Sequence, residues 1–178
     1  MWLRTALLTA LIATGCAAGG ARDSAPAPPA PADFRAIRVR GMDGAALPLA
    51  SVLGGRPTLV SFWAPWCEPC LREQPELERL SRAVNACGGA VAGVAVGESA
   101  ATVSAFVRDH ALTFPQFTDD DFHLADAMGQ RRIPAIVVFD QAARVVYTGN
   151  ALADAALDAM ASVMPARTDG ARCQLRAR

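Results

Sequence analysis

The chain contains no lysine and few aromatic residues, and its 17 basic side chains, all arginine, balance 17 acidic ones. No run of like charge forms a basic patch, which excludes a nucleic-acid binder that depends on charge. The apolar run near the start, Ala6 to Ala13, is too short to span a bilayer as a stable helix. With 52% hydrophobic and 19% charged residues, the composition is that of a globular protein with one core.

The first residues have the pattern of a bacterial export signal. Arg4 precedes the apolar run, and the small residues Ala13, Thr14 and Gly15 lead into Cys16. This order resembles a lipobox, in which the cysteine is lipidated and becomes the mature N-terminus, although such sites more often carry leucine where Ala13 stands. We therefore predict a lipoprotein signal peptide over residues 1–15 and a lipid anchor on Cys16. Ordinary cleavage with an incidental Cys16 is the alternative.

Residues 16–34 are predicted to be a tether between the anchor and the folded part. They are alanine, glycine, proline and short polar residues, and the four prolines between positions 26 and 31 prevent a helix or a core. An extended tether of this length would hold the domain about 45 Å from its anchor. The folded domain is expected over residues 35–164, followed by a polar tail over 165–178.

Within that domain, runs of β-branched and apolar residues alternate with helical patterns. We expect strands over residues 36–40, 47–53, 58–63, 90–96, 114–118, 133–140 and 144–148. We expect helices over about residues 67–86, 100–110, 122–128 and 152–164. The continuous apolar run Thr58 to Trp63 predicts a buried central strand, and Asp119, Asp120 and Asp121 offer N-caps for the third helix. This alternation indicates an α/β fold around a central sheet.

The most informative stretch runs from Phe62 to Cys70, where two cysteines spaced as Cys-X-X-Cys stand between a strand and a helix. Unpaired amides and the helix dipole at a helix N-terminus favour a thiolate at Cys67, and the thiolate is the nucleophile in disulfide exchange. Cys70 lies one turn further in and can resolve the mixed disulfide. Pro69 fits the first turn, where a missing N–H costs nothing. Trp66 can cover one side of the sulfur and is predicted to be a substrate-binding residue.

Other uses of the two cysteines are weaker interpretations. A structural disulfide is possible at this spacing, but its place at a helix N-terminus after a buried strand favours redox chemistry. A zinc site would need two more ligands, yet Cys87 and Cys173 are isolated and the only histidines are His110 and His123. A copper relay usually has a longer cysteine spacing and a histidine. We therefore expect no metal and no cofactor.

The stretch Trp63 to Pro75 (Trp-Ala-Pro-Trp-Cys-Glu-Pro-Cys-Leu-Arg-Glu-Gln-Pro) resembles the thioredoxin superfamily, and most closely its TlpA/ResA-like branch of anchored thiol reductases. The resemblance continues through Phe139 and Gly149 and covers about residues 36–163. It implies a thioredoxin fold: a central mixed β-sheet flanked by helices, with an N-terminal strand extension and an insert near residues 98–131.

Two further site residues follow from the resemblance. Glu73 lies where this branch keeps a partly buried acid, which can take and return the proton of Cys70; a glutamate on the helix surface is the alternative. Ser61 stands where thioredoxin itself has a buried aspartate, so the proton role passes to Glu73. Ile133-Pro134 resembles the cis-proline opposite the active disulfide, which would let Ile133 pair with a substrate strand; an ordinary proline at a strand entry is the alternative.

The resemblance also implies a function and a location. The protein would be a monomer on the periplasmic side of a bacterial membrane and would reduce disulfides of partner proteins, for example apocytochrome c. Its electrons would come from a membrane thiol carrier, and no nucleic acid would take part. A disulfide oxidase or isomerase of the same fold and a copper-binding module are the alternatives.

The remaining cysteines predict a second disulfide. Of five cysteines, Cys16 and the Cys67/Cys70 pair leave Cys87 and Cys173. Spare thiols in an oxidising compartment often pair, so we predict a structural bond between them. The alternative is that Cys87 fills an apolar space and Cys173 is a free thiol in the tail.

Overall fold

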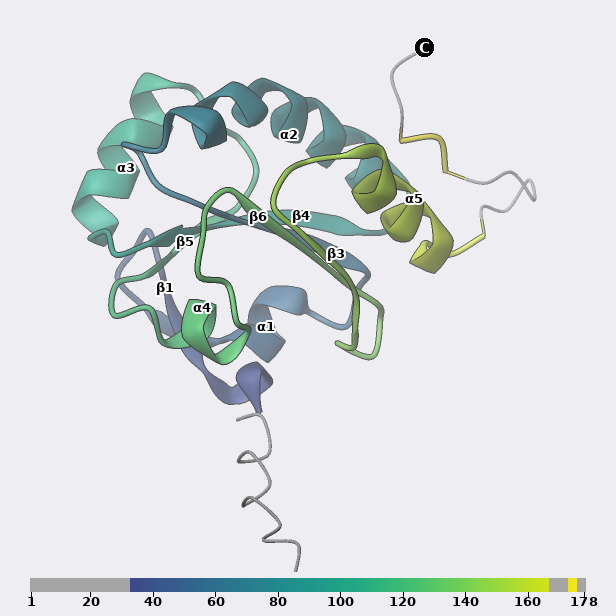
Figure 1. Ribbon diagram of the computed structural model, residues 1–178, viewed down its shortest axis with the longest axis horizontal. Coiled ribbons are helices and arrows are strands. Elements are labelled where there is room, and N and C mark those ends of the chain that lie inside the picture. Colours follow the sequence, from purple (N-terminus) through teal and green to yellow (C-terminus); the bar gives the residue numbers. More distant parts are fainter. Residues whose placement is uncertain (1–32, 167–172, 176–178) are drawn as a thin grey trace, which may run out of the picture. The chain divides into compact units, whose positions relative to one another are not determined.

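The computed structural model describes residues 33–166 and 173–175 (Figure 1). The predicted signal peptide, Cys16 and residues 17–32 of the predicted tether lie outside the described residues, as do residues 167–172 and 176–178. None of the helices in the described ranges is long and apolar enough to cross a membrane.

One mixed sheet of 7 strands runs through the domain in the order β2-β1-β5-β4-β3-β6-β7. The central strand β3 (Thr58–Trp63) pairs in parallel with β4 (Ala90–Val96) and antiparallel with β6 (Ala135–Phe139). Every residue of these three strands is buried, as expected for continuous apolar runs. The strand that leads into the cysteine motif is therefore an interior, fully buried strand of the sheet.

The remaining elements extend the sheet and cover it. The other strands are β1 (Arg38–Gly41), β2 (Ala46–Pro48), β5 (Gln116–Asp119) and β7 (Val145–Gly149). The helices are η1 (Phe34–Ala36), α1 (Leu49–Leu53), α2 (Glu68–Ala86), α3 (Ala100–Asp109), α4 (His123–Ala127) and α5 (Asp154–Val163). In Figure 1, α2, α3 and α5 lie on one side of the sheet, and α1 and α4 lie on the other. The expected sheet flanked by helices, extended by N-terminal strands, is confirmed.

The sheet has a hydrophobic core on each face. One cluster joins the central strands to α2 and α5 and includes Leu59, Leu77, Leu80, Ile136 and Met160. The other joins the same strands to α1 and α4 and includes Leu53, Val60, Phe62, Leu124 and Val137. Successive residues of β6 alternate between the two clusters, as do Leu59 and Val60 of β3, because side chains along a strand point to opposite faces.

One expectation from the sequence was wrong in this part of the molecule. The strand predicted over 47–53 ends at Pro48, and the rest forms α1, whose Leu49 and Leu53 lie one helical turn apart and are both buried. Gly54 then ends the helix in the left-handed conformation with a φ of 56°. In the C-terminal tail, Cys173 and Leu175 are buried in the core on the α2 side.

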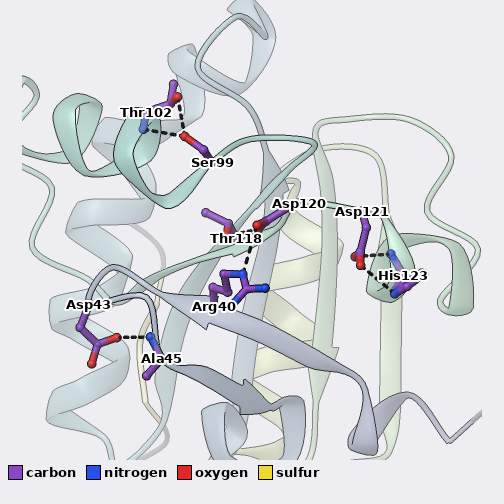
Figure 2. A network of polar contacts seen from close by, with 9 residues as sticks. All are labelled: Arg40, Asp43, Ala45, Ser99, Thr102, Thr118, Asp120, Asp121 and His123. Atoms are coloured by element: carbon purple, nitrogen blue, oxygen red, sulfur yellow. Dashed lines mark hydrogen bonds and ion pairs between the residues drawn. The ribbon is translucent and has the colours of Figure 1, made fainter.

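Polar contacts fasten the N-terminal hairpin to the sheet (Figure 2). Arg40 of β1 reaches from its strand to Asp120, just after β5, with 3.2 Å between Nε and Oδ2. Thr118 donates a hydrogen bond to the same carboxylate, so one acidic group joins β1 to β5. In the same view, Ser99 caps α3 by accepting a hydrogen bond of 3.1 Å from the amide of Thr102.

The short helix α4 is capped by a buried carboxylate. Asp119 accepts hydrogen bonds of 3.0 Å from the amide of Leu124 and 2.8 Å from that of Ala125. Burial raises the pKa of this carboxyl, and the two amide bonds partly oppose the rise. The residue just before the helix is Phe122, which adopts the left-handed conformation with a φ of 61°. Of the three aspartates predicted as caps, the buried Asp119 therefore satisfies the amides of Leu124 and Ala125 in α4.

Candidate functional site

The two cysteines of the motif stand where β3 gives way to α2. A turn follows Trp63, in which the amide of Cys67 donates to the carbonyl of Ala64 at 3.0 Å. Cys67 is the N-cap of α2, and its Sγ accepts a hydrogen bond of 3.3 Å from the amide of Cys70. The two residues form a disulfide with a Cα–Cα distance of 5.2 Å. The arrangement directs unpaired helix amides at the sulfur of Cys67.

The surroundings of the two sulfurs are apolar. Cys67 is 5% exposed and Cys70 is 1% exposed, so the outer sulfur is the one that a partner reaches first. They pack in a cluster with Trp63, Ala64, Ala95 and Val103. Trp66, directly before Cys67, is 68% exposed and presents its indole to solvent next to the pair.

A buried hydrogen bond of Trp63 fixes one member of this cluster, and the predictions from the sequence did not include it. The indole of Trp63 donates a hydrogen bond of 3.0 Å to Oε1 of Gln116, whose Nε2 donates to the carbonyl of Phe114 at 3.3 Å. The Gln116 amide lies against Gly93, where a Cβ would overlap it. Glycine inside a strand is a signal of such a close approach, so Gly93 could have pointed to this contact.

Glu73 lies on α2 one turn after Cys70, and its two carboxylate oxygens differ in their hydrogen bonding. Its Oε1 accepts a hydrogen bond of 2.9 Å from the amide of Leu152. Its Oε2 is buried and has no hydrogen-bond partner among the described residues. Burial raises the pKa of this carboxyl, and the bond from Leu152 opposes the rise. A carboxyl with a raised pKa, close in sequence to a redox cysteine, is suited to proton transfer.

Ile133 and Pro134 precede β6, and the peptide bond between them is cis. Ile133 is half-buried and packs against the cluster that contains Cys67 and Cys70. The structure therefore brings Trp66 and Ile133, predicted as substrate-binding residues, to the neighbourhood of the redox pair.

The other two cysteines meet at the far end of α2. Cys87 is the C-cap of this helix and forms a disulfide with Cys173, with a Cα–Cα distance of 6.1 Å. Arg79 also donates a hydrogen bond of 3.0 Å to the carbonyl of Leu175. The bond links positions 86 residues apart and attaches the tail segment to α2.

Neither histidine joins the cysteines. The ring of His110 stacks on Phe106 with 3.7 Å between centroids, and His123 pairs with Asp121 at 3.0 Å. Within residues 33–166 and 173–175, no group of three or more histidine, cysteine and acidic residues could hold a metal ion.

Comparison with known proteins gives matches over most of the chain. The family model described as Redoxin matches residues 26–160. The thiol-disulfide oxidoreductase ResA of Bacillus subtilis is 30% identical over 122 residues, which are 67% of this chain and 68% of ResA.

Solved structures are similar as well. A secreted Mycobacterium tuberculosis disulfide oxidoreductase homologous to E. coli DsbE has a TM-score of 0.61 and 26% identity, covering 74% of this chain and 99% of its own. The exposed lipoprotein thioredoxin of Streptococcus pneumoniae has a TM-score of 0.57 and 25% identity, covering 70% of this chain and 96% of its own.

Proposed function

Because the chain belongs to the Redoxin family, in the ResA/TlpA-like branch of the thioredoxin superfamily, we propose that it exchanges disulfides through Cys67 and Cys70. The protein is a thiol–disulfide oxidoreductase, as its relatives are. One observation carries the choice of this pair: its disulfide lies at the N-terminus of α2, where the sulfur of Cys67 accepts the amide of Cys70. Glu73 is proposed as the proton carrier and Cys87–Cys173 as a structural bond.

The reduced protein would act in two steps. The Cys67 thiolate attacks one sulfur of a partner disulfide, so that a mixed disulfide forms and the other partner sulfur leaves as a thiolate. Glu73 then accepts the proton of Cys70, and the Cys70 thiolate attacks Cys67 and releases the second partner sulfur. Two electrons pass to the partner, one of whose sulfurs takes the Cys70 proton from Glu73 while the other takes a proton from solvent, and the protein is left with the Cys67–Cys70 disulfide. A dithiol on a membrane carrier returns two electrons.

We further propose that the substrates are disulfides of partner proteins on the periplasmic side of a bacterial membrane, with apocytochrome c as the example that the branch suggests. A lipid on Cys16 would hold the protein there, in monomeric form. The S. pneumoniae relative, described as an exposed lipoprotein, supports this location.

Trapping tests the assignment of the pair. Cys67→Ala should abolish exchange, while Cys70→Ala should accumulate mixed disulfides with a model protein substrate. A brief alkylation of the reduced wild type should label Cys67 before Cys70, since Cys67 is the more exposed of the two and lies at the helix end. Exchange that survives in Cys67→Ala would contradict the proposal.

The reduction potential tests the direction of electron flow. A reductase should equilibrate near the roughly −270 mV of thioredoxin, whereas an oxidase should lie nearer the roughly −120 mV of DsbA and an isomerase near about −180 mV. Metal analysis of the anaerobically reduced protein separates the copper-binding alternative, which requires stoichiometric copper on the two cysteines.

A further inference from the structure

A hollow of about 420 Å³ is lined by residues that include two neighbours of the redox pair. These neighbours are Trp66, which directly precedes Cys67, and Ile133, which packs against the cluster of both redox cysteines. Its size is within the range of sites that accept small ligands or side chains. A partner segment whose disulfide meets Cys67 would pass over this hollow.

Phe122 supplies an aromatic ring to the hollow from the turn before α4. The ring is exposed, and its residue holds a φ of 61°, a conformation that is an outlier for a bulky side chain. Two features keep it there: Asp119 accepts hydrogen bonds from the amides of Leu124 and Ala125 in α4, and Gly97 has no Cβ, which would overlap the ring. Backbone held in such a conformation is often found at ligand sites.

Two arginines give the hollow a positive charge. Arg131 and Arg132 line it, both are exposed, and none of its lining residues is acidic. The ion pairs formed within residues 33–166 and 173–175 do not include either arginine. Their guanidinium groups are therefore available to carboxylates of a partner.

We propose that the hollow selects partner disulfides by sequence: it receives an aromatic side chain next to the attacked cysteine and pairs Arg131 and Arg132 with acidic residues beside it. This inference rests on the proposed function, because the segment is held while Cys67 forms its bond to the partner sulfur. The aromatic side chain packs between Trp66, Phe122 and Ile133. The arginines contribute mainly to the rate of encounter and to specificity.

Disulfide-bonded peptides test the selection. Three peptides differ only in the residues beside one cysteine. The first has an aromatic residue and two aspartates there, the second has the aromatic residue and two lysines, and the third has serine in place of the aromatic residue and two aspartates. The reduced wild type should reduce the first about 3- to 10-fold faster than the second, and this ratio should fall toward one at high salt. In Arg131→Gln/Arg132→Gln the ratio should fall toward one at low salt as well.

Two further variants complete the design. Phe122→Gly keeps the left-handed backbone accessible and should lose the preference for the aromatic over the serine peptide. The control Arg56→Gln/Arg108→Gln removes the same charge at exposed positions outside the hollow and should keep both preferences. If Phe122→Gly fails to fold, the exposed arginine pair still tests the charge selection.

The outcomes separate the two proposals. Equal rates for the three peptides, or a faster reaction with lysine, would overturn the selection while leaving disulfide exchange at Cys67 intact. Failure of the reduced wild type to reduce any peptide, and also the small neutral bis(2-hydroxyethyl) disulfide, would overturn the proposed function itself.

Discussion

The Oε1 atom of Glu73 accepts a hydrogen bond of 2.9 Å from the backbone amide of Leu152, which joins α2 to the segment before α5. This bond fixes the carboxyl in place and leaves its second oxygen buried without a partner among the described residues. The second oxygen of this carboxylate can bind one proton. Glu73 lies one helical turn from Cys70, the cysteine that must lose a proton in the resolving step.

Glu73→Gln should slow the resolving step. The glutamine can still accept the Leu152 bond, but it cannot carry a proton, so the mixed disulfide should resolve at least about 10-fold more slowly. Because burial raises the pKa of Glu73, the wild-type rate should rise with pH through that raised pKa, and the variant should lose this limb of the profile. Asp109→Asn, at an exposed acid at the end of α3, is the control. An unchanged profile in Glu73→Gln would leave Glu73 without a proton role.

The same variant should change the dependence of stability on pH. A raised folded-state pKa means that the folded protein holds this proton more tightly than the unfolded chain does. That stability is fully present below the ordinary value of 4.5 and is lost as pH rises through the raised pKa. Glu73→Gln should therefore unfold at higher urea than the wild type near neutral pH, with the difference shrinking below about pH 4. A variant that is less stable at neutral pH would contradict this.

Cys16 should be the site of lipid attachment. Globomycin should block processing of the wild type, and labelled fatty acid should be incorporated into it but not into Cys16→Ser. The control Cys87→Ser should retain the label, because its change lies in the folded domain. Wild-type protein that is released to the periplasm without label would refute the anchor.

The Cys87–Cys173 disulfide should stabilise the fold. The loop-entropy account gives up to about 4.6 kcal/mol for closing the loop between positions 86 residues apart, so Cys87→Ser/Cys173→Ser should unfold at clearly lower urea. Cys67→Ser/Cys70→Ser, which opens a loop with a sequence separation of 3, should lose much less. Peptide mapping of alkylated, unreduced protein checks the bond directly, and recovery of both cysteines in alkylated form would exclude it.

Gly93→Ala should weaken the support beneath the redox pair. The new methyl group would displace the Gln116 amide and break its bond to Trp63, at a cost of about 1–3 kcal/mol in the free energy of unfolding. In a Gln116→Ala background the same change should cost clearly less, because the overlapping amide is gone. Equal costs in both backgrounds would show that the overlap is not the cause.

The central part of the fold could be predicted from the sequence because its signals are local. The apolar runs of β3 and β4 identify buried strands, and the cysteine motif identifies the junction with α2. The helix Leu49–Leu53 was mistaken for a strand, because a short apolar run of this length fits either structure. The burial of Leu49 and Leu53 on one side of the helical turn distinguishes the helix from a strand.

The polar contacts of the site could not be predicted, because they join distant positions. Nothing in the spacing of Glu73 and Leu152, or of Trp63 and Gln116, reveals that they touch. The backbone conformation of Phe122 could not be predicted for a different reason. Its left-handed φ opposes the intrinsic preference of a bulky residue and exists only because the surrounding fold imposes it.

The helix α2 has a disulfide cysteine at each end, with Cys67 as its N-cap and Cys87 as its C-cap. Each disulfide accepts two electrons, so complete reduction of the described domain consumes four, whereas one catalytic turnover consumes two. An assay that counts the thiols of the described domain after strong reduction therefore overstates its working capacity by a factor of two.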